Sequence, residues 1–116
     1  MKLKQVQKIL KAQSHTGEAL LEAEVSAACG CDLMSDVLAF ASDHILLLTG
    51  LVNLQVIRTA EMLDIKGIVF VRGKVPTEDM KKLAEEKQIC LLSTNQPLYV
   101  ACGKLYSKGL GEKGGS

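Results

Sequence analysis

Two short apolar runs on either side of a helical stretch constrain this chain more than any other feature. Residues 45–48 and 68–71 each contain four consecutive apolar side chains, and a turn signal at Thr49-Gly50 closes the first run. Runs of that length are typical of strands buried on both faces. From residue 52 to residue 63, apolar residues recur every three or four positions, as on one face of a helix. Strand, helix and strand within about 30 residues predict a βαβ unit with a parallel pair of strands.

The other segments predict further elements of the same kind. Helices are expected over 1–12, from Asp32 to Ser42-Asp43, over 53–66, from Thr77 and from Pro97, and strands over 25–31, 45–48, 68–71 and 89–92. Residues 13–17 indicate a turn with His15 exposed, and residues 18–24 are ambiguous. The alternation predicts an α/β fold, a three-layer α/β/α sandwich with a mostly parallel sheet of about four strands. We expect a single domain over 1–108 and a flexible Gly-rich tail over 109–116.

Composition excludes several classes of protein. The chain has 14 basic and 13 acidic residues and a formal net charge of +1, so it lacks the basic field of a nucleic-acid or membrane-surface binder. Two tyrosines, two phenylalanines and no tryptophan leave few platforms on which bases could stack. No apolar stretch approaches the roughly 18 residues of a membrane span, and no signal peptide is evident. We therefore expect a soluble cytoplasmic protein.

Four cysteines, Cys29, Cys31, Cys90 and Cys102, are spaced irregularly. Without a secretion signal they are expected to be reduced thiols. Cys29 and Cys31 would share one face of a strand, which leaves a redox or metal site as an alternative. A structural zinc site needs four ligands, however, and no second close pair of cysteines exists. We therefore expect no metal and no cofactor.

Four loops follow the predicted strands and lead toward helix N-termini. In open α/β sheets, ligands bind beyond the carboxyl ends of the strands, and helix N-termini favour anions. The candidate ligand-binding residues in these loops are Asp32, Thr49, Gly50, Asn53, Arg72, Gly73, Lys74, Ser93 and Thr94. Arg72 and Lys74 flank a glycine, as a phosphate or carboxylate cradle would. The alternative interpretation is that two exposed charges bracket a turn glycine.

No catalytic motif accompanies these loops. The sequence lacks a phosphate loop, a Gly-x-Gly-x-x-Gly turn after a strand and a nucleophile elbow. Neither histidine has a recognisable partner. Asp32 and Asp36 could serve acid–base or magnesium chemistry, but capping of the helix that follows explains Asp32, and solvent exposure explains Asp36. The chain is therefore not expected to be an enzyme.

Several segments together resemble the DRTGG domain. The resemblance rests on Ile45–Gly50, on Gly67–Thr77 and on Ile89–Thr94. Upstream, Val6–Leu10 and Asp32–Asp36 look like the start of small stand-alone DRTGG proteins, which is also similar to the N-terminal domain of HPr kinase/phosphorylase. The motif that names the family is degenerate here. Leu51-Val52 stand where the family has Asp-Arg, and only Gly73 is kept from the later Thr-Gly-Gly.

The resemblance implies an α/β fold without catalysis of its own. In some pyrophosphatases the DRTGG domain stands beside nucleotide-binding CBS domains and forms dimer contacts. The kinase activity of HPr kinase resides in a separate phosphate-loop domain, which is not found in this sequence. The first hypothesis is therefore a regulatory or assembly module, acting as a homodimer or with a partner protein. The alternative is a sensor that binds a nucleotide or another small anion at the carboxyl edge of the sheet.

Overall fold

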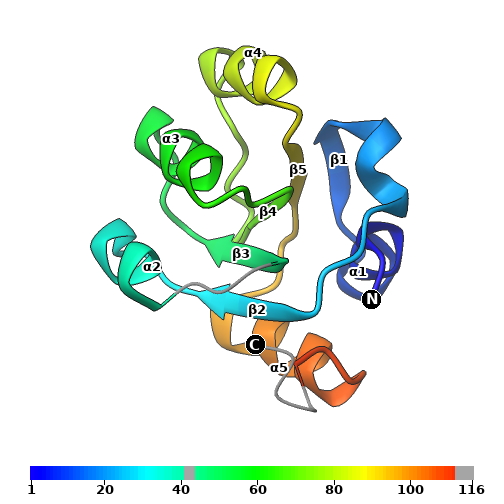
Figure 1. The fold of residues 1–116 in the computed structure, drawn as a ribbon. Coiled ribbons are helices and arrows are strands. Elements are labelled where there is room, and N and C mark those ends of the chain that lie inside the picture. The colour runs from blue at the N-terminus through cyan, green and yellow to red at the C-terminus, as the bar shows by residue number, and fades with distance from the viewer. Residues whose placement is uncertain (41–43, 112–116) are drawn as a thin grey trace.

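A computed structural model describes residues 1–40 and 44–111 and shows a sheet between two layers of helices (Figure 1). The strands are β1 Gln13–Thr16, β2 Ala27–Gly30, β3 Ile45–Thr49, β4 Gly67–Phe70 and β5 Cys90–Ser93. The helices are α1 Leu3–Leu10, the 3-10 helix η1 Glu18–Glu22, α2 Met34–Phe40, α3 Leu54–Met62, α4 Glu78–Lys87 and α5 Leu98–Ser107. The predicted α/β/α architecture is confirmed. The predicted helix end at Ser42-Asp43 lies outside the described residues.

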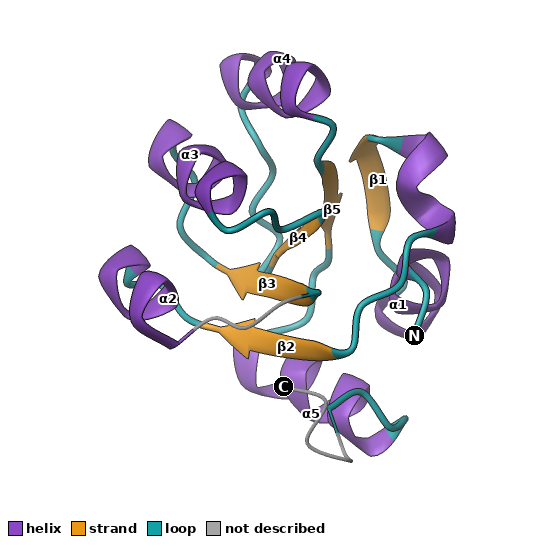
Figure 2. Cartoon of the chain, viewed as in Figure 1, coloured by secondary structure: helices purple, strands orange, loops and turns teal. Residues whose placement is uncertain are grey.

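The order of the strands explains how the helices are distributed. The sheet has the order β1-β5-β4-β3-β2, and β2 to β5 run parallel to their neighbours. Crossovers between parallel strands are right-handed, so three crossovers in one direction along the sheet place α2, α3 and α4 on one face. Helices α1 and α5 cover the other face (Figure 2).

Both faces of the sheet are buried, which explains the uninterrupted apolar runs. In β3, Ile45 and Leu47 join the core on the side of α2, α3 and α4. Leu46 and Leu48 join the core on the side of α1 and α5. Successive side chains of a strand point to opposite faces, so each strand contributes to two cores.

The sheet has five strands rather than about four, because residues 13–16 form β1 and not a turn. β1 runs antiparallel to β5, with Ser14 opposite Leu92. Its sequence Gln-Ser-His-Thr has no apolar alternation, so the strand conformation follows from pairing with β5 and not from a local pattern. The prediction that His15 is exposed was also wrong, since its ring is partly buried against β5.

The C-terminal end of the described chain packs onto the core. Leu110, which falls in the predicted tail, is buried in the cluster that includes Leu105 and Ala101. Residues 112–116 lie outside the described residues, so the flexible tail stays a prediction. Among the helices of the described residues, none is long and apolar enough to cross a membrane.

Candidate functional site

Four predicted site residues meet where β2, β3 and β4 end. Asp32 Oδ1 accepts hydrogen bonds from Thr49 Oγ1 at 3.0 Å and from Gly50 N at 2.7 Å. Arg72 Nη2 lies 3.8 Å from Asp32 Oδ2. A Cβ atom at Gly50 would lie 2.8 Å from Arg72 Cζ, so the guanidinium covers the Gly50 backbone. We call Asp32, Thr49, Gly50 and Arg72 the Asp32 cluster.

The Asp32 cluster satisfies its own charges and polar groups. Asp32 was expected to cap the helix that follows it, and this was wrong: its carboxylate faces Thr49 and Gly50 instead. In the first turn of α2, the amides of Asp36 and Val37 donate to the carbonyl of Leu33. Since the side chains of Asp32 and Arg72 are both half-exposed, their ion pair is worth at most about 1 kcal/mol. An anion at Arg72 would compete with Asp32.

The turn that follows β4 is built around a left-handed pair of residues. Arg72 has φ 58° and Gly73 has φ 73°. Arg72 N donates to Gln96 O at 2.9 Å, and Gly73 N donates to Thr94 O at 3.0 Å. These two amides, which a phosphate cradle would use, are therefore engaged with the loop after β5. Lys74, the next residue of this turn, is exposed.

A small cavity of about 170 Å³ lies beside that turn, and we call it the edge pocket. Its lining residues come from the loop after β4, from the end of β5 and the loop after it, and from the start of β1 and the residues before it: Lys11, Gln13, Gly73, Val75, Ser93, Thr94 and Asn95. Gly73, Ser93 and Thr94 belong to the predicted site. Lys11 and Gln13 were missed, because only the pairing of β1 with β5 brings them to this edge.

One residue of the pocket lining, Ser93, is in contact with a histidine outside that lining. His15 Nε2 lies 2.8 Å from Ser93 Oγ, although the two residues are 78 positions apart. Ser93 is only 7% exposed. Burial lowers the pKa of His15, and the positive charge of Lys81 lowers it further. The described lining has one basic residue and no acidic residue.

Two other predicted site residues have structural roles. Thr94 Oγ1 donates to Leu10 O at 2.8 Å and so fixes the C-terminal end of α1 to the loop after β5. Asn53 Oδ1 accepts from Val56 N at 3.3 Å, so Asn53 is the N-cap of α3. Neither side chain is free to serve a ligand without giving up that bond.

Cys29 and Cys31 both contact the core on the side of α2 and α3, as expected for one face of a strand. Burial raises the pKa of Cys29 above its ordinary value. Within residues 1–40 and 44–111, no group of three or more His, Cys, Asp or Glu side chains is arranged to hold a metal ion.

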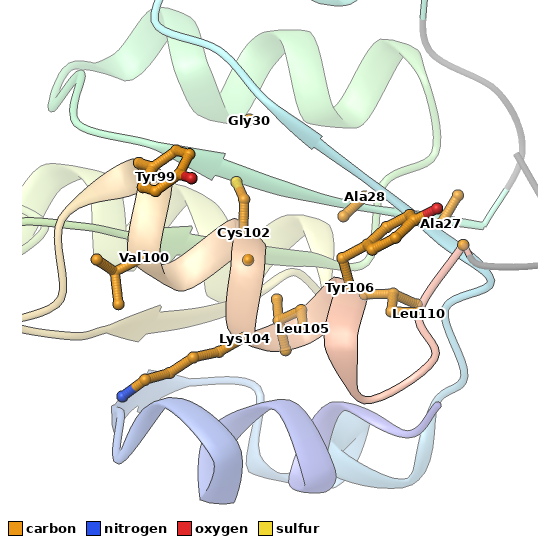
Figure 3. Close-up of a pocket in the computed structure, with 12 residues that line it drawn as sticks. Ala27, Ala28, Gly30, Tyr99, Val100, Cys102, Lys104, Leu105, Tyr106 and Leu110 are labelled. Carbon is orange, nitrogen blue, oxygen red and sulfur yellow. The ribbon is translucent and has the colours of Figure 1, made fainter.

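A larger groove lies between β2 and α5, and none of the predicted site residues lines it (Figure 3). It has a volume of about 680 Å³ and is mostly apolar. Tyr99 and Tyr106 stand at its rim, with exposed fractions of 89% and 62%. Cys102 points toward Gly30, where a Cβ atom would lie 2.6 Å from its Sγ, so the glycine allows α5 to approach β2 closely. We call this surface the β2–α5 groove.

No family model matches the chain, and no curated protein matches it. Its fold is similar to a solved structure, the CBS and DRTGG domains of the regulatory region of Clostridium perfringens pyrophosphatase complexed with the activator diadenosine tetraphosphate. The TM-score is 0.69 at 12% sequence identity, and the match covers 90% of this chain and 45% of that chain. The likeness shows a shared fold with that regulatory region, whereas membership of the DRTGG family stays a prediction.

Proposed function

We propose that this chain is a non-catalytic regulatory module that assembles as a homodimer through the β2–α5 groove. The observation that carries the proposal is an edge strand next to exposed aromatic residues. In the described part of the chain, β2 pairs only with β3, so its other edge has no strand partner. Unpaired backbone groups of an edge strand readily accept a second chain.

The side chains around this edge suit a partner protein. Tyr99 and Tyr106 are seven positions apart on α5, which is about two helical turns. The two tyrosines therefore lie on the same side of the helix (Figure 3). Tyrosine is enriched in protein interfaces, where its ring supplies contact area and its hydroxyl tolerates a wet rim. Ala28 and Gly30 leave room beside them.

A second copy of the chain fits this surface by symmetry. Two identical edge strands related by a two-fold axis can pair in antiparallel fashion, and each copy then presents its tyrosines to the other. The solved structure that shares the fold is described as a regulatory region, which supports a regulatory rather than catalytic role. The match covers only 45% of that chain, so binding of its activator is not part of the function proposed for this chain.

The oligomeric state in solution tests the dimer. Sedimentation equilibrium over a series of protein concentrations should give a mass approaching twice the 12.5 kDa of one chain. Tyr106→Lys should shift the equilibrium to the monomer, because it places a charge in the apolar interface. Met62→Lys is the matched control, since Met62 is an exposed apolar residue on α3, in the opposite helical layer. A wild-type monomer at all concentrations, or equal effects of both variants, would reject this interface.

A second candidate function is anion sensing at the carboxyl edge, and the edge pocket favours it. The pocket is lined by Lys11, Gln13 and Asn95 together with two buried hydroxyl residues, Ser93 and Thr94. Its described lining contains no acidic residue. Sulfate in excess should raise the melting temperature above that in sodium chloride of equal ionic strength, because binding to the folded state stabilises it. Lys11→Gln should reduce the shift, whereas Lys66→Gln, remote from the pocket, should not.

A further inference from the structure

We propose that the edge pocket binds a small oxyanion, such as phosphate or the phosphoryl end of a larger ligand, through the hydroxyl of Ser93, and that His15 switches this hydroxyl between binding and non-binding orientations. The inference rests on the second candidate function and assigns it a ligand class and a control residue. It does not depend on whether the chain forms a dimer.

The size of the pocket sets the class of ligand. Pockets for drug-sized ligands have volumes of roughly 300–1,000 Å³, whereas one water molecule occupies about 30 Å³. A cavity of about 170 Å³ lies between these values and suits one compact polar group rather than a base or a sugar ring. Lys11 supplies a positive charge, and no described lining residue opposes it.

The contact between His15 and Ser93 has two possible hydrogen-bond directions. A neutral His15 without a proton on Nε2 accepts from the Ser93 hydroxyl, which then turns only lone pairs toward the pocket. With a proton on Nε2, the ring donates to Ser93 Oγ, and the hydroxyl hydrogen is free to point at an anion. Protonation of the ring places a hydrogen on both nitrogens, so it enforces the binding orientation.

Charged groups around the ring make this orientation sensitive to the ligand. Lys81 on α4 acts on the ring as a nearby positive charge, and Lys11 after α1 is the basic residue of the pocket lining. Also on α4, Glu85 Oε1 accepts a hydrogen bond at 3.3 Å from the backbone of Gly17, two residues after His15. Since burial and Lys81 lower the pKa of His15, the ring is mostly neutral at neutral pH. A bound anion stabilises the protonated ring, so binding takes up a proton and strengthens as the pH falls.

Calorimetric titration with sodium sulfate tests this switch, because sulfate keeps its charge over the range used. Titrations at about pH 5.5 and about pH 8, on either side of the ordinary range of histidine, should show tighter binding at the lower pH. Ser93→Ala should weaken binding by about tenfold, as expected for a lost hydrogen bond to a charged group. Ser14→Ala is the matched control, since Ser14 lies on β1, opposite β5, and does not line the pocket. His15→Gln offers a permanent donor and should bind sulfate without the dependence on pH.

The outcomes separate the two proposals. No sulfate binding at either pH would overturn both the carboxyl-edge sensor and the switch. Binding that Ser93→Ala leaves unchanged, or that stays equally pH-dependent in His15→Gln, would overturn the switch alone. A parallel titration with glycerol phosphate distinguishes the source of the ligand. Inorganic phosphate is titrated for comparison. If glycerol phosphate binds more tightly than inorganic phosphate, the ligand is the phosphoryl end of a larger molecule; if it binds more weakly, the ligand is a free anion.

Discussion

Replacing Thr16 with valine tests how the edge strand β1 is attached to the sheet. The register between β1 and β5 shifts between Ser14 and Thr16, so backbone pairing is interrupted there. The Thr16 hydroxyl fills the gap: Oγ1 donates to Ile89 O at 2.8 Å and accepts from Leu91 N at 3.1 Å. Thr16 is 3% exposed, so water cannot replace these bonds while the strand is in place.

The expected loss of stability follows from these two bonds. Valine has nearly the shape of threonine but leaves a buried carbonyl and a buried amide without partners, at about 1–3 kcal/mol each. The added methyl group returns about 0.8 kcal/mol of hydrophobic burial. We expect Thr16→Val to lower the free energy of unfolding by about 3 kcal/mol, a large part of the roughly 5–15 kcal/mol of a typical domain.

The same substitution at Thr59 is a matched control. Thr59 on α3 is fully buried, but its Oγ1 has no hydrogen-bond partner among the described residues. Thr59→Val should therefore be neutral or should stabilise the protein by about 1 kcal/mol. Urea unfolding followed by circular dichroism measures both variants, provided that the dependence on denaturant is unchanged. Equal effects of the two substitutions would refute the role assigned to the Thr16 hydroxyl.

Three further predictions address α5, a buried thiol and pH. Gly30→Val should lower the melting temperature because its side chain meets Cys102, whereas Gly103→Ala, whose Cβ meets nothing within 4 Å, should raise stability by up to about 1 kcal/mol. Burial raises the pKa of Cys90 to about 11, so a disulfide reagent at pH 8 (about the ordinary thiol pKa) should modify this thiol only after unfolding. Burial lowers the pKa of His15 below 6.5, so this histidine binds a proton more readily in the unfolded chain than in the folded one. The free energy of unfolding, measured in urea, should therefore fall as the pH drops through 6.5. The fall should be less steep in His15→Gln, which has no such group.

The parallel part of the fold was predictable because its signals are local. Four apolar residues in a row, as in 45–48, indicate a strand covered on both faces, and such strands separated by helices indicate a parallel sheet. The caps at Asn53 and Thr77 follow from short polar side chains that accept amide hydrogens two or three residues away. The polar edge strand β1 has no such local signal, and with it Lys11, Gln13 and His15 were missed from the candidate site.

The sequence by itself determined the four parallel strands and the five α-helices, but not the edge strand β1, and it determined that β3, β4 and β5 are buried on both faces. The tertiary structure decided which loops meet. It placed Asp32 against Thr49 and Gly50, so that the carboxylate does not cap α2, and it brought His15 to Ser93. The physical reason is one of range. Side-chain periodicity reflects the burial of each segment, whereas contacts between distant residues depend on strand order and on the direction of the edge strand, which periodicity does not encode.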